Sequence, residues 1–258
     1  MTSEESHGFT PIQPDPSANY AELLFSAARF KRYLKSTDGD YQKAISLCKW
    51  NQDFAGLLQA QIGYVEIAIR NTIDRELRHL CAQNLKNPNW CLPGQAPQLV
   101  NALIRGNLLN ARQLALEDAR KWKEPHHHRV DLTVNHDDIL AHLMWGSWVK
   151  LIGEATTSEK TAKQQILWTI ALYRAFPNVE PTEKGRMYIA KNMNYVRRVR
   201  NRAAHFDNLF EEAYKINSII GALMSLLSSI ETGLTHGWID TITLRRSART
   251  FKTLEASS

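Results

Sequence analysis

The distribution of apolar residues along the chain predicts helices almost everywhere. From residue 51 onward, apolar residues recur at steps of three and four, which places them on one face of a long helix. They are Leu58, Ile62, Val65, Ile69, Ile73, Leu77 and Leu80. Residues 209–231 repeat this pattern and predict a second strongly amphipathic helix. Only twelve Gly and nine Pro are present, too few for a turn-rich all-β architecture, so the pattern indicates an all-α protein.

Capping residues and prolines divide the chain into about eight helices. Asp40 is a good N-cap for a helix that runs to about Trp50, and Thr182 for one that reaches about His205. Three prolines interrupt the helical pattern in "NPNWCLPGQAP", after the long helix. The other helices are expected at residues 20–33 and 98–122, after a cap at Asp137 or Asp138, and from Ser158 to the prolines at 177 and 181.

These elements predict a single helical domain at residues 20–232, with a helical extension at its N-terminal end. A polar, acidic arm at residues 1–19 precedes this domain and is expected to be flexible. A basic tail at residues 233–258 follows it and is expected to be loose.

Composition is that of an ordinary globular protein and fits a cytoplasmic location. Of the 258 residues, 43% are hydrophobic and 22% are charged, and no apolar run approaches the roughly 18 residues that a membrane span needs. The N-terminal residues contain no hydrophobic region of the kind found in secretory signals. Three cysteines without a CxxC pair suggest neither disulfides nor a zinc site, which fits a reducing compartment. The net charge of +6 is compatible with binding to nucleic acid, although many ordinary proteins are as basic.

The basic charge is concentrated in the helix that Thr182 begins. Between Thr182 and His205 there are seven Lys or Arg residues and one acidic residue, Glu183, a surplus equal to that of the whole chain. Like charges three or four positions apart on a helix repel each other, so stability alone does not favour this arrangement. An anionic ligand explains it better, and phosphate is the commonest candidate.

The stretch "VRRVRNRAAHFDN" combines this charge with a histidine. Arg197, Asn201 and His205 are four positions apart and project from one face, whereas Arg200 and His205 differ by about 140° around an ideal helix. Histidine suits proton transfer near neutral pH, and a permanently charged arginine suits a phosphate on which negative charge builds up. Such residues can cleave RNA without a metal, by activating the 2′-hydroxyl against the adjacent phosphorus. A plainer alternative is that Arg-x(4)-His is a chance pattern and that His205 only complements the helix dipole.

Several blocks of the sequence resemble the Abi-like (abortive infection) family of the HEPN superfamily. "RNRAAH" is similar to the superfamily's Arg-(polar)-x(3)-His signature, with Asn201 as the polar residue. The blocks "SAARFKRYL", "AISLCKWNQDFAGLLQAQIGYVEIAIRNTIDREL", "MWGSWVKL" and "VRNRAAHFDNL" follow in the family's order over roughly residues 25 to 230. The resemblance implies an α-helical HEPN core, a symmetric homodimer, and metal-independent RNA cleavage that leaves a 2′,3′-cyclic phosphate. It also implies a role as a toxin or phage-defence effector, with no cofactor.

Carried over to this sequence, the resemblance makes Arg200 and His205 the catalytic pair and Asn201 their polar companion. Arg198 lies seven positions before His205, an alternative spacing, but Val199 after it lacks the polarity that the signature requires. Glu66, Arg70 and Asn71 match an upstream block of the family and either contact RNA or organise the core around the site. The expected RNA-binding residues are Arg197, Arg198, Arg202, Lys191, Arg70 and Asn71, with Glu66 in a supporting role.

Two further groups of residues are weaker candidates. His126, His127, His128, His136 and His142 lie close to acidic residues, yet no metal-binding motif accompanies them, so a solvated loop is the better interpretation. Trp145, Trp148, Trp168 and Tyr173 suit core packing better than base stacking. Two alternatives to an endoribonuclease remain open: a non-catalytic RNA-binding module, and a toxin that a protein or small-RNA antitoxin keeps inactive.

Overall fold

The computed structural model describes residues 16–84, 87–121, 129, 132–153 and 157–256. These residues form helices and no strand, which confirms the predicted all-α class. The α-helices are α1 (Pro16–Phe25), α2 (Ala27–Lys35), α3 (Tyr41–Gln83), α4 (Gln98–Lys121), α5 (His136–Ala141), α6 (Trp145–Ile152), α7 (Ser158–Ile170), α8 (Glu183–Ala204), α9 (Phe210–Tyr214), α10 (Ile216–Ile230) and α11 (Thr241–Ala256). The described residues also contain two 3₁₀ turns, η1 (Leu172–Ala175) and η2 (Thr232–Thr235). No helix in these ranges has both the length and the apolar composition of a membrane-spanning segment.

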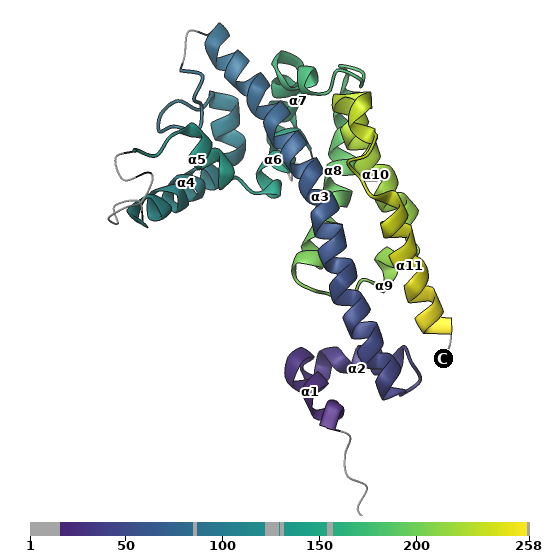
Figure 1. The fold of residues 1–258 in the computed structure, drawn as a ribbon. Helices are drawn as coiled ribbons and strands as arrows, with labels where there is room; N and C mark the ends of the chain where they lie inside the picture. The colour runs from purple at the N-terminus through teal and green to yellow at the C-terminus, as the bar shows by residue number, and fades with distance from the viewer. Residues whose placement is uncertain (1–15, 85–86, 122–128, 130–131, 154–156, 257–258) are drawn as a thin grey trace, which may run out of the picture.

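Helix α3 is the spine of the molecule. It contains 43 residues and is therefore about 64 Å long. Figure 1 shows α8, α10 and α11 lying along it, α1 and α2 at its first end, and α4 and α5 in a lobe beside its second half. The predicted apolar stripe from Leu58 to Leu77 is buried along this spine. Asp40 is its N-cap, as predicted, and accepts a hydrogen bond from the backbone N–H of Lys43 at 3.0 Å.

The two helices predicted on either side of Asn51 are one helix. Nothing between Trp50 and Asn51 breaks the backbone pattern, and both residues lie inside α3. Elsewhere the prediction merged helices that the structure separates. Ser26, with φ of 62°, divides residues 20–33 into α1 and α2, and the segments 137–153 and 209–231 each contain two helices. The number of helices is therefore eleven in the described residues, compared with about eight predicted.

The cap of α5 is Asn135, and the prediction of Asp137 or Asp138 was wrong. The Asn135 side chain accepts hydrogen bonds from the backbone N–H groups of Asp137 and Asp138, at 2.9 and 3.0 Å. The Asp138 carboxylate accepts one in return from the backbone of Asn135, at 2.9 Å. This reciprocal pair is a capping box, in which the acidic residue occupies the third helical position and not the cap.

The C-terminal tail is also different from its prediction. Residues 241–256 are not loose but form α11, whose Leu244, Ala248 and Phe251 are buried at helical spacing. The Phe251 ring stacks on Phe210 of α9, with 4.9 Å between ring centroids. The prediction failed because the many basic residues of this segment conceal a short apolar stripe. Residues 1–15 of the predicted N-terminal arm lie outside the described residues, and residues 16–19 belong to α1.

Helices α3 and α8 run antiparallel, and this relation places the predicted site. The Gln59 side-chain amide donates to the carbonyl oxygen of Ala203 at 3.3 Å, and Asn51 contacts the chain at Asp207. Residues later in α3 therefore lie beside residues earlier in α8. The end of α8 lies beside the first half of α3, close to α2.

Candidate functional site at the end of α8

The last three turns of α8 separate an apolar side from a polar side. Val196, Val199 and Ala203 are buried against the rest of the molecule. Arg198, Asn201 and His205 are exposed, and Arg197 and Arg200 are half-buried. Because the helix is continuous from Glu183 to Ala204, Arg197 and Asn201 lie one turn apart on the face that ends at His205, as predicted.

His205 is the residue at which α8 stops. Its backbone N–H donates to the carbonyl oxygen of Asn201 at 3.1 Å, which closes the last helical turn. The next residue, Phe206, has φ of 48°, in the left-handed region that ends many helices. His205 is therefore exposed on the turn that ends α8.

A buried asparagine from α3 holds this turn in place. Asn51 is 0% exposed, and its side chain donates to the carbonyl oxygen of Asp207 at 3.0 Å. Its side-chain oxygen accepts from the backbone N–H of Leu209 at 2.9 Å. Sequence reasoning missed Asn51, although an asparagine on the buried face of an amphipathic helix was a signal, because a buried amide needs partners.

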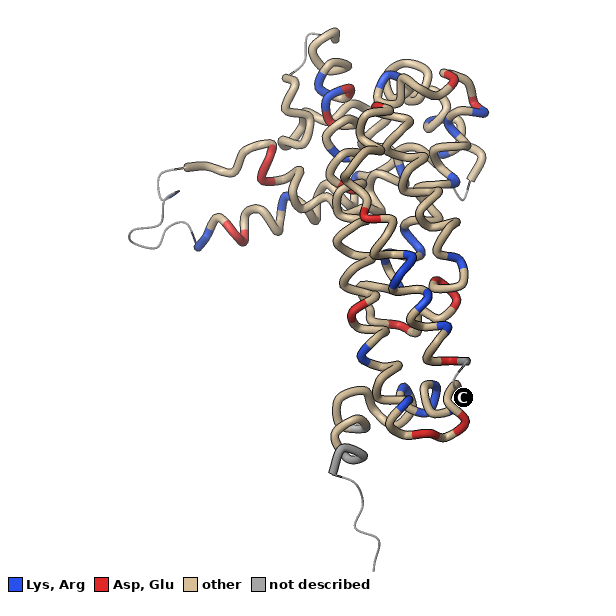
Figure 2. Tube along the Cα trace, turned by 45° about the vertical axis from the view of Figure 1, so that its right-hand side comes forward, with Lys and Arg blue, Asp and Glu red and all other residues tan. Residues whose placement is uncertain are grey.

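The arginines of α8 differ in whether a carboxylate neutralises them. Acidic residues lie among the basic ones along the column of helices (Figure 2), so carboxylates are close enough to form ion pairs with some of the arginines. In the described part of the chain, no carboxylate forms an ion pair with Arg197, Arg198 or Arg200. The guanidinium of Arg198 lies 5.8 Å from the ring centroid of Tyr195. These three cations are available to an anionic ligand.

Arg202 is placed differently. Its Nη1 lies 2.7 Å from Glu212 Oε1, and its Nε lies 3.4 Å from Asp207 Oδ2. The same guanidinium also contacts Glu211 and donates to the carbonyl oxygen of Asn208. Arg202 therefore connects the end of α8 to α9, and its charge is largely compensated within the chain.

Arg200 and His205 do not share a face of α8 in one protomer. The five-residue step between them corresponds to about 140° of rotation. His205 projects from the exposed side, whereas Arg200 lies next to the buried stripe of Val196, Val199 and Ala203. Their convergence on one phosphate stays a prediction that depends on a second subunit.

Glu66, Arg70, Asn71 and Lys191 lie far along the helices from His205. Arg70 is eleven residues beyond Gln59, the residue of α3 that contacts Ala203, so it is displaced by about 16 Å along the helix. Lys191 is fourteen residues before His205, about 21 Å along α8 by the same measure. The Arg70 guanidinium contacts the Asn71 side-chain oxygen at 3.4 Å, and no ion pair with Glu66 is found among the described residues.

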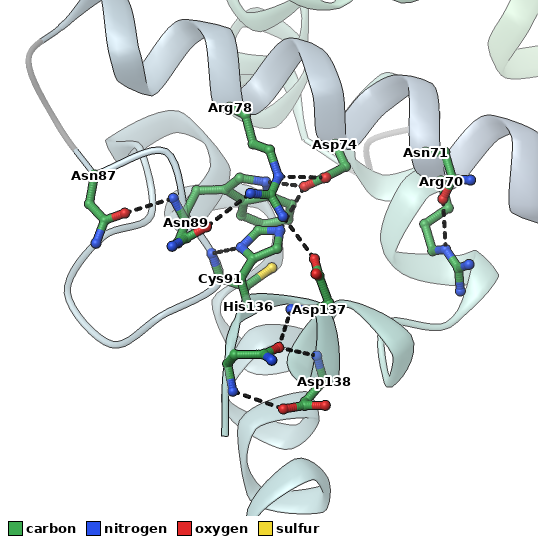
Figure 3. A network of polar contacts seen from close by, with 12 residues as sticks. Arg70, Asn71, Asp74, Arg78, Asn87, Asn89, Cys91, His136, Asp137 and Asp138 are labelled. Carbon is green, nitrogen blue, oxygen red and sulfur yellow. Dashed lines mark hydrogen bonds and ion pairs between the residues drawn. The ribbon is translucent and has the colours of Figure 1, made fainter. Parts of the chain in front are cut away.

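Arg70 and Asn71 line a separate hollow of about 280 Å³ between α3 and α5. Its other lining residues are Asp74, Asp137, Leu140 and Ala141. Figure 3 shows the Arg70–Asn71 pair beside, and not joined to, a polar network that extends from Asp74 to α5. The structure therefore groups Arg70 and Asn71 with α5 and not with His205.

His136 lies at the centre of this network, so the interpretation of a solvated loop was wrong for this residue. It is 2% exposed, and its Nε2 lies 2.8 Å from Asp74 Oδ1 (Figure 3). Its Nδ1 accepts from the backbone N–H of Cys91 at 3.3 Å, which assigns the ring proton to Nε2. Sequence spacing could not reveal this contact, because Asp74 is 62 residues away.

Asp74 receives hydrogen bonds from three side chains, those of Arg78, Trp90 and His136. Trp90 Nε1 donates to its Oδ1 and Arg78 Nε to its Oδ2, both at 2.8 Å. Burial by itself raises the pKa of Asp74, but these hydrogen bonds and that of His136 outweigh burial, so the pKa lies below its ordinary value. The network joins α5 to α3 through an ionised carboxylate whose oxygens accept hydrogen bonds from within the network.

The remaining candidates are the other histidines, the large aromatic residues and the cysteines. His142 contacts Asp118 at 3.3 Å, His126, His127 and His128 lie outside the described residues, and no group of three metal ligands is present within those described. Trp145, Trp148 and Trp168 are buried, which confirms their predicted core packing, and Tyr173 is half-buried. Burial raises the pKa of the Cys48 thiol to about 12, which makes it a poor nucleophile.

Comparison with known proteins adds no family assignment. No protein-family model matches the chain, and no curated protein and no solved structure matches it. Its function therefore has to be inferred from its own residues.

Proposed function

We propose that the protein is a metal-independent endoribonuclease of the Abi-like HEPN type, which acts in the cytoplasm as an abortive-infection effector. The observation that carries the proposal is the exposed polar face at the end of α8. There, Arg197 and Arg198 lead to the exposed His205 at the helix end, and Arg200 lies closer to the buried stripe; none of the three has a carboxylate partner in the described residues. A phosphate backbone supplies the anions that these arginines lack, and the histidine supplies proton transfer.

In the proposed reaction, the neutral imidazole of His205 removes the proton of an RNA 2′-hydroxyl. The 2′-oxygen attacks the adjacent phosphorus, and the bond to the 5′-oxygen of the next nucleotide breaks. That leaving oxygen takes up a proton from water and the imidazolium of His205 returns its proton to water, so that the products are a 2′,3′-cyclic phosphate and a 5′-hydroxyl. Arg200 stabilises the charge on the non-bridging oxygens, and Asn201 orients the imidazole or binds one of those oxygens.

The angle between Arg200 and His205 makes a homodimer part of the proposal. Within one protomer the two side chains diverge by about 140° around α8. A two-fold axis beside α8 would bring Arg200 of one protomer towards His205 of the partner subunit. Arg197 and Arg198 would bind the RNA backbone next to this site, and Lys191, Arg70 and Asn71 would contact more distant parts of the RNA.

The same angle favours a second candidate function. If no dimer brings the pair together, the basic face binds RNA without cleaving it, and His205 only ends the helix. A toxin that an antitoxin keeps inactive by covering this face is a variant of the first function.

Incubation of the purified protein with mixed RNAs in EDTA tests these alternatives. We expect cleavage that survives chelation and falls by about 10²-fold or more in both Arg200→Ala and His205→Ala. Arg105→Ala is the matched control, because it removes an exposed positive charge from α4, away from α8. Salt-sensitive RNA binding without cleavage by the wild type would establish the second function. Cleavage that EDTA abolishes would contradict the metal-independent mechanism.

A further inference from the structure

Helix α2 lies against the turn that carries His205, a relation that the sequence does not reveal. Phe30 and Tyr33 of α2 are buried, and the Tyr33 ring meets Phe210 edge to face, with 5.6 Å between centroids. These contacts place α2 beside the end of α8. Arg29 and Arg32 of α2 contact the turn there, at His205 and Asp207.

Arg29 contacts His205 through the backbone of that residue. Its Nη2 donates to the backbone carbonyl oxygen of His205 at 3.4 Å, across 176 residues of sequence. The side chain is exposed, and in the described part of the chain no carboxylate pairs with it. A guanidinium has five N–H donors, so this single contact leaves most of them free for a ligand.

The charges around Arg29 do not repel an anion. Asp207, the carboxylate on the same turn, lies 3.6 Å from Arg32 Nη1 and 3.4 Å from Arg202 Nε, so Arg32 compensates it together with Arg202, which it shares with Glu211 and Glu212. The partial negative charge at the end of α8 is offset by Arg29 itself, which contacts a terminal carbonyl oxygen.

We propose that Arg29 of α2 and His205 of α8 form a binding site for a phosphate oxyanion within one protomer. The proposal rests on the proposed function. Because Arg200 is directed away from His205 of its own chain, Arg29 supplies the guanidinium beside His205 within one protomer. Arg29 donates to non-bridging oxygens of the phosphodiester, and the imidazole faces the attacking 2′-hydroxyl. Arg200 then completes the site from the partner subunit.

The alternative role for Arg29 is purely structural. A cation that bonds the last carbonyl oxygens of a helix stabilises that helix whether or not a ligand binds. The two roles differ in a measurable way, because a structural contact changes stability but not the affinity for phosphate.

Phosphate titration of the full-length protein separates the two roles. The probes are inorganic phosphate and uridine 3′-monophosphate, and the signal is the Cε1–H resonance of His205, assigned with His205→Gln. We expect wild type and Lys31→Gln to show the same saturable shift, and Arg29→Gln to bind roughly ten- to a hundredfold more weakly. Lys31 is the matched control, since it is exposed on α2 and lies about 200° around the helix from Arg29.

Thermal unfolding of the same variants shows whether Arg29→Gln remains folded, and Arg29→Lys provides a second variant that keeps the charge. Unchanged phosphate affinity in a folded Arg29→Gln variant would overturn the site. RNA cleavage distinguishes this failure from failure of the proposed function. Cleavage that Arg29→Gln leaves intact contradicts the Arg29 site alone. Arg29-dependent phosphate binding in a wild type that cleaves no RNA contradicts the nuclease alone.

Discussion

Identical side chains in α8 have different roles because their neighbours differ. Arg202 is held by Glu212 and Asp207, whereas Arg197 has no carboxylate partner among the described residues. Glu212 is largely buried, and burial raises the pKa of its carboxyl group. The positive charge of Arg202 lowers this pKa but does not cancel the effect of burial. We therefore expect a mutation of Arg202 to affect folding, whereas a mutation of Arg197 should affect only binding of the proposed RNA ligand.

We predict that Arg202→Ala lowers the free energy of unfolding by about 2–3 kcal/mol, because it leaves Glu212 buried without its cation. Arg197→Ala, the matched substitution five positions earlier, should change stability by less than about 0.5 kcal/mol. Urea unfolding followed by intrinsic fluorescence measures both. Equal losses in the two variants would mean that the Arg202–Glu212 contact contributes nothing.

Asp74 should make stability depend on pH. Its folded-state pKa lies below its ordinary value, so the ionised form stabilises the fold at neutral pH. This contribution is lost as the pH falls from the ordinary range of an aspartate, about 4, through the lowered pKa. We predict that Asp74→Asn loses about 2–4 kcal/mol at pH 7 and that this difference shrinks at acidic pH. Urea unfolding between pH 3 and 7 tests the prediction; a difference that stays constant over this range would contradict it.

At the scale of whole elements, α11 is part of the core and not an appendage. The indole N–H of Trp50 in α3 donates to the carbonyl oxygen of Ser247 at 2.9 Å, and Phe251 lies between aromatic rings of α3 and α9. The helix thereby covers the first half of α3, next to the turn that Asn51 holds.

We predict that Phe251→Ala destabilises the protein by about 3–5 kcal/mol, because it removes a fully buried aromatic ring and leaves a cavity. Ile242→Ala is the control on the same helix: Ile242 is 69% exposed, and the change should cost less than about 0.5 kcal/mol. Thermal and urea unfolding give both values. A small loss for Phe251→Ala would show that α11 detaches from the core in solution.

At the scale of the whole molecule, the proposed active site needs two chains. Arg29 and His205 lie together in one protomer, but Arg200 is directed elsewhere on α8. The proposed dimer combines Arg200 of one protomer with His205 of the partner subunit. Mixing two inactive variants tests this arrangement.

We predict that Arg200→Ala and His205→Ala, each inactive alone, regain about a quarter of wild-type cleavage when mixed in equal amounts and allowed to exchange subunits. About half of the dimers are then mixed, and each has one of its two sites intact. The control is a mixture of Arg200→Ala with the double variant, which contains no intact site. Absence of recovery, with subunit exchange shown by sedimentation or light scattering, would place Arg200 and His205 in the same protomer's site or refute the pair.

The sequence by itself determined the helical class, the buried stripe of α3 and the continuity of α8 up to His205. These properties follow from local spacing, because a period near 3.6 residues and a capping residue act within one or two turns of the chain. The position of Arg197 and Asn201 on the face of α8 that ends at His205 could be predicted for the same reason.

Only the tertiary structure decided which polar groups meet. Arg29 reaches His205 across 176 residues, Asn51 reaches Leu209 across 158, and His136 reaches Asp74 across 62. Contacts of this kind leave no period in the sequence, because they depend on how helices pack and not on how each one forms. For the same reason, the sequence alone could not distinguish the compensated Arg202 from the unpaired Arg197, since their partners are set by the fold around the helix.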